Sequence, residues 1–153
     1  MLKLHKLVST SLGIGYIGKG GGTVAAVAAC LCLYALHQAG GDRLVGWLPL
    51  VTALLTLLGV WSANEVEPYW GKDDKKVVID EVAGMCISLL FLPITGSSLL
   101  AGLVLFRFFD IAKPLYIRKL EKVSGGWGVM LDDVVAGVYA NFILQLFLYF
   151  KIL

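Results

Sequence analysis

The chain has 153 residues, and 58% of them are hydrophobic. Its mean hydropathy is +0.82, whereas ordinary soluble domains are roughly 45–50% apolar. This composition favours a membrane protein built as a single domain over residues 1–153. The net charge of +2 is too small to indicate a nucleic-acid partner, and three cysteines without a paired framework argue against a disulfide scaffold.

The N-terminal region is basic and rich in glycine. Its start, Met1–Lys6, is similar to that of a signal peptide, but no small-x-small cleavage site follows, so we expect it to be retained. The stretch Gly18-Lys-Gly-Gly-Gly-Thr23 leads into the first apolar segment. Such a turn can present backbone N–H groups to a phosphate, with Lys19 and Thr23 as candidate ligands. A flexible loop is the alternative interpretation, since the order of a Walker A motif is absent.

Five apolar segments follow, and none alternates with the period of two that is typical of a strand. They predict an all-α fold, a compact membrane bundle of about five apolar helices. The second segment is long enough to span a bilayer by itself, and the third and fourth are short for a full span. The segments are Thr23–His37, Leu44–Ala63, Val78–Leu92, Ser97–Phe109 and Val134–Phe150.

Basic residues are concentrated in alternate connections. They precede the first segment and follow the second and the fourth, whereas only Arg43 and Lys151 lie on the other side. This distribution predicts five spans with the N-terminus in the cytoplasm. All the polar clusters would then lie at one face of the membrane. The residues counted on the cytoplasmic side are Lys3, Lys6, Lys19, Lys72, Lys75, Lys76, Lys113, Arg118, Lys119 and Lys122.

Five acidic residues abut these apolar runs: Asp80, Glu81, Asp110, Asp132 and Asp133. An ionised carboxylate beside hydrocarbon costs several kcal/mol unless a cation or hydrogen bonds compensate it. We therefore expect the acids to converge on a shared cation. Stabilisation by the helix macrodipole is the alternative, and it would explain one carboxylate per helix but not two adjacent pairs.

Cationic side chains flank one of these acids at a regular spacing. Arg107, Asp110 and Lys113 are three residues apart and so share a broad helix face, which Pro114 should end. A self-neutralising row of ion pairs would explain this pattern. An arginine at the end of an apolar helix also suits a bidentate contact with phosphate.

Three motifs resemble those of the phosphatidylglycerophosphatase A family, over about Gly13 to Gly137. One departure is the stretch before Gly22-Thr23, where the family usually has a proline. The resemblance implies a Mg²⁺-dependent phosphatase that converts phosphatidylglycerophosphate to phosphatidylglycerol in phospholipid biosynthesis. The motifs are Ile79-Asp-Glu-x-x-Gly84, Phe106-Arg-x-x-Asp-x-x-Lys-Pro114 and Gly125-Gly-x-Gly-x-x-x-Asp-Asp-x-x-Ala-Gly137.

We predict that Glu81, Asp110 and Asp133 bind one or two Mg²⁺ ions, because this ion prefers oxygen ligands. Asp80 and Asp132 would support them. Arg107 and Lys113 would clamp the phosphate, assisted by Lys19. Two catalytic routes stay open at this point: a metal-activated water with a carboxylate as general base, and an aspartyl-phosphate formed on Asp110 or Asp133.

The expected partner is a lipid in the bilayer, with the site on the cytoplasmic side of a bacterial-type inner membrane. Two other classes of function fit a membrane chain with charged residues. Ion-coupled transporters also carry intramembrane acids, although here no segment has a charge at mid-span. The third class is a non-catalytic protein whose charges only bind anionic lipid.

Overall fold

The computed structural model describes residues 1–114, 116–120 and 122–152, and over these residues it is entirely helical. It confirms the all-α prediction. Each of the five predicted apolar segments falls wholly or mainly in one of α2, α3, α4, α5 and α7. In chain order the elements are α1 (Leu2–Ser9), η1 (Ile14–Ile17), α2 (Gly21–Val45), α3 (Leu48–Trp70), α4 (Ile79–Ser88), α5 (Gly96–Ala112), α6 (Ile117–Leu120) and α7 (Gly126–Tyr149).

The expectation of five membrane spans needs correction. Among the described residues, only α2, α3 and α7 are both long and apolar enough to cross a bilayer. The helices α4 and α5 have 10 and 17 residues and fall short of the roughly 20 that a span requires. Their apolar residues are needed instead for burial against the longer helices.

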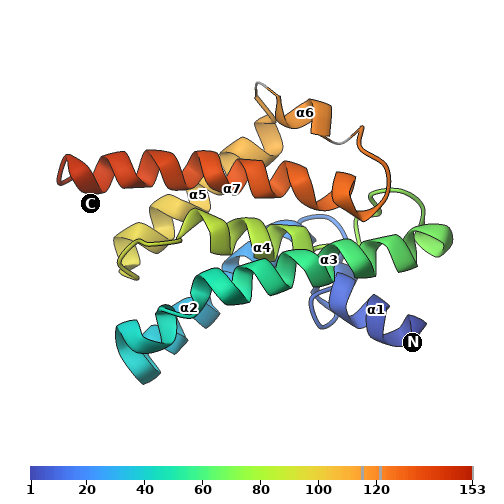
Figure 1. The fold of residues 1–153 in the computed structure, drawn as a ribbon, viewed down its shortest axis with the longest axis horizontal. Helices are drawn as coiled ribbons and strands as arrows, with labels where there is room; N and C mark the ends of the chain where they lie inside the picture. The colour runs from blue at the N-terminus through green and yellow to red at the C-terminus, as the bar shows by residue number, and fades with distance from the viewer. Residues whose placement is uncertain (115, 121, 153) are drawn as a thin grey trace.

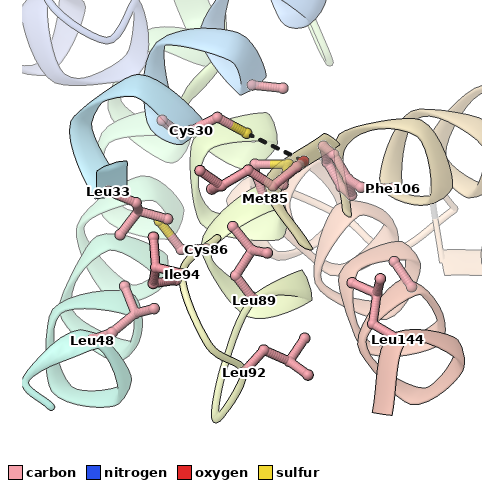
Figure 2. Packing of buried hydrophobic residues seen from close by; sticks show 14 of the residues in the cluster. Cys30, Leu33, Leu48, Met85, Cys86, Leu89, Leu92, Ile94, Phe106 and Leu144 are labelled. Atoms are coloured by element: carbon pink, nitrogen blue, oxygen red, sulfur yellow. Dashed lines mark hydrogen bonds between the residues drawn. The ribbon is translucent and has the colours of Figure 1, made fainter. Parts of the chain in front are cut away.

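Helix α4 lies at the centre of the bundle, between α7 and α3 in Figure 1, and it also packs against α2 and α5. Its buried Met85 and the Leu89 that directly follows the helix meet Phe106 of α5 and Leu144 of α7 in the main apolar core (Figure 2). A short helix can be this central because it is covered on all sides. The start of α4 therefore becomes the place where the polar ends of other helices can meet.

The crossing of α4 and α7 is unusually close because both helices carry glycine there. A Cβ atom on Gly84 would lie 2.7 Å from the carbonyl oxygen of Asp133 and 2.5 Å from the ring of Phe106. Gly126 approaches the carbonyl of Val60 on α3 in the same way. The absence of side chains at Gly84 and Gly126 therefore lets α7 approach both α4 and α3 closely.

The N-terminal segment is fixed beside the start of α4. The imidazole of His5 on α1 is buried against α3, with its Nδ1 3.3 Å from the Ser62 hydroxyl. The backbone N–H of Val78 donates a 2.8 Å hydrogen bond to the carbonyl of Ser9. Gly15 lies directly against the carbonyl of Lys76. These contacts hold the glycine-rich turn at residues 18–22 next to the acidic end of α4.

Candidate active site

Four helix ends surround one polar cavity of about 490 Å³. They are the N-terminal ends of α2, α4 and α7 and the C-terminal end of α5. The cavity brings together eight of the nine predicted site residues. Thr23 is exposed in the first turn of α2 and is not among the described lining residues. The eight are Lys19, Asp80, Glu81, Arg107, Asp110, Lys113, Asp132 and Asp133.

Helix α5 ends just before Pro114, as the sequence predicted. The helix stops at Ala112, and Lys113 adopts a left-handed conformation with a φ of 46°, since the residue before proline disfavours helical geometry. Its N–H still donates to the carbonyl of Phe109 at 2.8 Å. The Lys113 ammonium reaches across to α7, where it lies 2.6 Å from Asp132 Oδ2. Pro114 thus helps to direct a cation into the cavity.

Helix α7 begins earlier than expected. Asp132 and Asp133 lie six and seven residues after Gly126, in the second turn, and both are buried. The macrodipole acts mainly within the first turn, so it does not account for this acidic pair. Asp80 and Glu81, in contrast, occupy the first turn of α4. The burial of the second pair must be compensated by other groups.

Three of the acids form a group with the spacing of metal ligands. Carboxylate oxygens of Asp80, Glu81 and Asp133 all lie within 4.8 Å of one another, and Asp80 and Asp133 are buried. Asp80 Oδ1 and Glu81 Oε2 are buried without a hydrogen-bond partner among the described residues. A divalent cation that prefers oxygen ligands would satisfy these atoms, so the donor set fits Mg²⁺.

The other two acids are paired with cations. Arg107 forms an ion pair with Asp110 and lies 3.9 Å from Glu81, while Lys113 pairs with Asp132. The carboxyl group of Asp110 also contacts that of Asp133. Of the acids predicted to bind or support Mg²⁺, Asp80, Glu81 and Asp133 thus lie at ligand spacing, whereas Asp110 is paired with Arg107. Arg107 and Lys113 line the same cavity as Asp80, Glu81 and Asp133.

The pKa of Asp80 is compatible with a cation bound nearby. Burial raises the pKa of Asp80 well above its usual value, and the nearby carboxylates of Glu81 and Asp133 raise it further. A bound cation would reverse both effects, because it stabilises the ionised form. The raised pKa of Asp80 is therefore compatible with a cation site among these carboxylates.

The glycine-rich turn at residues 18–22 leaves space for the side chains of the cavity, because its glycines carry none. A Cβ atom on Gly22 would overlap the Glu81 carboxylate and would lie 3.2 Å from Nη1 of Arg107. Gly20, Gly21 and Gly22 all line the cavity at the start of α2. The N–H of Gly21 donates to the carbonyl of Gly18 at 2.9 Å. The other N–H groups of a first helical turn have no partner within the helix, so they can serve an anion.

Three charged residues of the α3–α4 loop also line the cavity and were not predicted as site residues: Asp73, Asp74 and Lys75. Asp74 accepts a 2.9 Å hydrogen bond from the backbone N–H of Lys76 and pairs with its ammonium at 3.0 Å. The signal was the charged run that begins at Lys72. This run predicts the membrane orientation, but it also lies a few residues before Asp80, and that proximity places it beside the cavity.

The chain is similar in sequence to known proteins, whereas no solved structure matches it significantly. The model of the family "Phosphatidylglycerophosphatase A" matches residues 7–148. A Haemophilus influenzae protein named phosphatidylglycerophosphatase A is 35% identical over 137 residues, which are 88% of this chain and 82% of that protein. An Escherichia coli protein of the same name is 40% identical over 98 residues, covering 62% and 57%.

A third relative has a different name. A Bacteroides thetaiotaomicron protein, described as a candidate phosphatidylinositol-3-phosphatase, is 41% identical over 141 residues, which are 90% of this chain and 89% of that protein. These matches favour an enzyme over the transporter and scaffold alternatives. The chain belongs to the phosphatidylglycerophosphatase A family, and with three apolar helices of membrane-spanning length among its described residues it is a membrane-associated phosphatase.

Proposed function

We propose that this protein hydrolyses the terminal phosphomonoester of phosphatidylglycerophosphate, yielding phosphatidylglycerol and phosphate, with Mg²⁺ as cofactor. The observation that carries the proposal is the juxtaposition in one cavity of the Asp80–Glu81–Asp133 trio with Arg107 and Lys113. An oxygen-rich cation site beside fixed cations suits a phosphate monoester dianion. The names of the Haemophilus influenzae and Escherichia coli relatives support this substrate.

The trio would hold the metal ion. Mg²⁺ bound there would supply positive charge to the phosphoryl oxygens. Its binding would also remove the energetic penalty of burying Asp80 Oδ1 and Glu81 Oε2 without hydrogen-bond partners. The ion pairs of Asp110 and Asp132 keep these two acids close to the trio, where they can orient the groups around it.

The phosphate would be held from two sides. Arg107 is the better-suited side chain, because a guanidinium forms two parallel hydrogen bonds with a phosphate. Lys113 adds a point charge from the end of α5, and Lys19 with the first turn of α2 faces the cavity from the other side. Phosphoryl transfer depends mainly on such positioning and on charge stabilisation.

Two routes for the attack make different predictions. In the first, one of the cavity carboxylates takes a proton from the attacking water. In the second, Asp110 or Asp133 attacks phosphorus and a phosphoenzyme forms. We propose the first route, because Asp110 is engaged by Arg107 and Asp133 belongs to the proposed metal group, so neither carboxylate is available to attack phosphorus. Acid-quenched single turnovers with labelled substrate would retain label on the protein only in the second route.

The site would face the cytoplasm. Its cavity lies at the helix ends, where a lipid head group can enter while the acyl chains stay in the hydrocarbon. The basic residues Lys72, Lys75 and Lys76 follow α3 at this end of the bundle, as expected for the cytoplasmic side. Hydrolysis there does not require the lipid to leave the membrane.

The test is phosphate release by the purified protein in detergent or vesicles, with and without Mg²⁺. The substrates are phosphatidylglycerophosphate, phosphatidylinositol 3-phosphate and phosphatidic acid. Release from phosphatidylglycerophosphate that stops when EDTA is added supports the proposal. Release that persists in EDTA would remove the metal from it, and no release from any lipid would refute it.

A second substrate is favoured by one observation, the 41% identity to the Bacteroides thetaiotaomicron protein. Phosphatidylinositol 3-phosphate is also a lipid phosphomonoester presented at the membrane surface. The ratio of kcat/KM values for the two lipids decides between them. A ratio in favour of the inositol lipid would assign that substrate to the same cavity.

A further inference from the structure

A second cavity of about 440 Å³ lies between α2 and α3, and its lining is almost entirely apolar. Ala28 and Leu36 form its wall on α2, Leu48 and Leu58 form the opposite wall on α3, and Val82 of α4 forms the floor. Both walls are helices of membrane-spanning length with exposed apolar side chains. Whatever fills this groove therefore comes from a hydrocarbon environment.

The dimensions of the groove suit a single chain of methylenes. Along α3 its lining extends from Leu48 to Leu58, which is roughly 15 Å at 1.5 Å per residue. This is about half of the ~30 Å hydrocarbon core, the depth of one leaflet. One turn of a helix, roughly 10 Å wide and 5.4 Å high, already occupies about 400 Å³. The groove thus matches an acyl chain better than a further helix.

One end of the groove adjoins the active site. On α4, Ile79 and Val82 line the groove, while Asp80 and Glu81 between them line the polar cavity. Ile14 also lines the groove, and its carbonyl oxygen is 3.8 Å from the Cβ position of Gly21, which lines the polar cavity. A molecule extending from one cavity to the other would have a polar head and an apolar tail.

A buried polar atom lies at the end of the groove that adjoins the active site. The hydroxyl oxygen of Ser11 is buried without a hydrogen-bond partner among the described residues, and Ser11 lines the groove. An unsatisfied buried hydroxyl is costly, so a ligand that accepts its hydrogen bond would be stabilised. The ester carbonyl of a glycerolipid is such an acceptor and lies between head group and tail.

We propose that the groove binds one acyl chain of the lipid substrate, with its ester near Ser11 and its tail extending towards Leu48. This inference rests on the proposed function, because the same lipid would place its phosphate among Asp80, Glu81 and Arg107. The groove then supplies binding energy far from the reacting phosphate, and it selects lipids over soluble phosphomonoesters.

Filling the groove tests this selection. Ala28→Phe places a ring in the groove, and Ala35→Phe adds the same ring to an exposed position of α2 that does not line it. Each buried methylene contributes a factor of about four in affinity, so excluding two should raise KM for a long-chain substrate roughly fifteenfold. We expect that rise for Ala28→Phe, with little change for a dihexanoyl form of the lipid. Equal behaviour of the two variants would overturn the inference.

A reversible modification gives a second measurement that does not depend on how a variant folds. Cys32 lines the groove and is exposed, whereas Cys30 and Cys86 are buried. A hexadecyl methanethiosulfonate should block hydrolysis of the long-chain lipid, and a reductant should restore it. Cys32→Ser should resist the reagent. Undiminished activity after complete labelling of Cys32 would contradict occupancy of the groove.

Photocrosslinking separates failure of this inference from failure of the proposed function. A phosphatidylglycerophosphate with a diazirine near the end of one acyl chain should label the groove walls near Leu36 and Leu48. Labelling there without phosphate release would refute the proposed function and retain the acyl site. Phosphate release with labels confined to the outer faces of α5 and α7 would refute the acyl site. Disulfide bonds between Cys32 residues of two copies would assign the groove to a dimer instead.

Discussion

The backbone of Gly137 lies so close to the carbonyl oxygen of Gly84 that a Cβ atom on Gly137 would overlap it. This contact sets the distance between α4 and α7. The same two helices carry Asp80 and Asp133, whose carboxylates belong to one group with metal-ligand spacing. The separation of the helices is therefore also a determinant of the proposed metal site.

Gly137→Ala should separate the two helices and weaken the site together with the fold. Overpacking of a well-packed interior typically costs about 1–3 kcal/mol. We expect a lower unfolding temperature and a marked loss of phosphate release. Gly96→Ala is the matched control, since its Cβ would meet no described atom within 4 Å. If Gly137→Ala matched the control in both measurements, the close crossing would not matter to the site.

Gly22→Ala should disturb the site without unfolding the bundle. The new methyl group would overlap the end of the Glu81 side chain, which can rotate away from the trio. We expect an unfolding temperature near that of the wild type in EDTA, and a smaller stabilisation on adding Mg²⁺. Bound ligand stabilises a folded protein according to its affinity, so thermal unfolding over a range of Mg²⁺ concentrations measures the effect. An unchanged Mg²⁺ dependence would contradict the assigned position of Glu81.

Glu81→Gln and Asp133→Asn should abolish turnover while leaving the helical content intact. Each change keeps the size of the side chain and removes one anionic ligand from the trio. The measurements are phosphate release and circular dichroism on the same samples. Glu65→Gln, on the exposed surface of α3, is the control. Activity near the wild-type level in both variants would show that the metal lies elsewhere.

The ion pair of Lys113 and Asp132 should behave as a unit. Its nitrogen and oxygen are 2.6 Å apart, and the Asp132 side chain is largely buried. Removing one partner of a buried pair typically costs about 3–5 kcal/mol, because the remaining charge is uncompensated. We expect Lys113→Met alone to destabilise more than Lys113→Met combined with Asp132→Asn. A denaturant-based double-mutant cycle with additive effects would contradict this coupling.

Stability without metal should depend on pH through Asp80. Because its folded-state pKa is raised, the folded protein holds a proton that the unfolded chain has already released. Stability in EDTA should therefore fall as the pH rises from the usual carboxyl range towards the raised pKa. Mg²⁺ should reduce this slope, since it replaces the proton and releases it. Thermal unfolding across pH checks the sign, and Asp80→Asn should show a weaker slope.

The convergence of the acids could be predicted because it follows from local rules. Basic loops fix which helix ends share a membrane face, and Asp80, Asp110 and Asp133 each lie near such an end. Which of these carboxylates lie at ligand spacing from one another could not be predicted in the same way. It depends on which carboxylates Arg107 and Lys113 neutralise, and that choice is made by side chains from different helices.

The number of membrane spans could not be predicted from local sequence patterns either. The apolar run around α4 is explained by burial on all its sides, and periodicity cannot distinguish a helix buried in protein from one buried in lipid. The position of α1 rests on long-range contacts such as that of His5 with Ser62, for which the sequence offers no pattern. The contribution of Asp73 and Asp74 likewise depends on how the α3–α4 loop folds over the cavity.

The acids that meet in the cavity are contributed by helices that enter the membrane at different times during synthesis. When α4 and α5 have emerged from the ribosome, Asp80, Glu81 and Arg107 are present, but Asp133 is not, because it lies on α7 close to the C-terminus. A nascent chain would thus be inert towards lipid phosphates until α7 has inserted. Catalytic competence would then be acquired only after α7 has been added, and a chain truncated before α7 should have none.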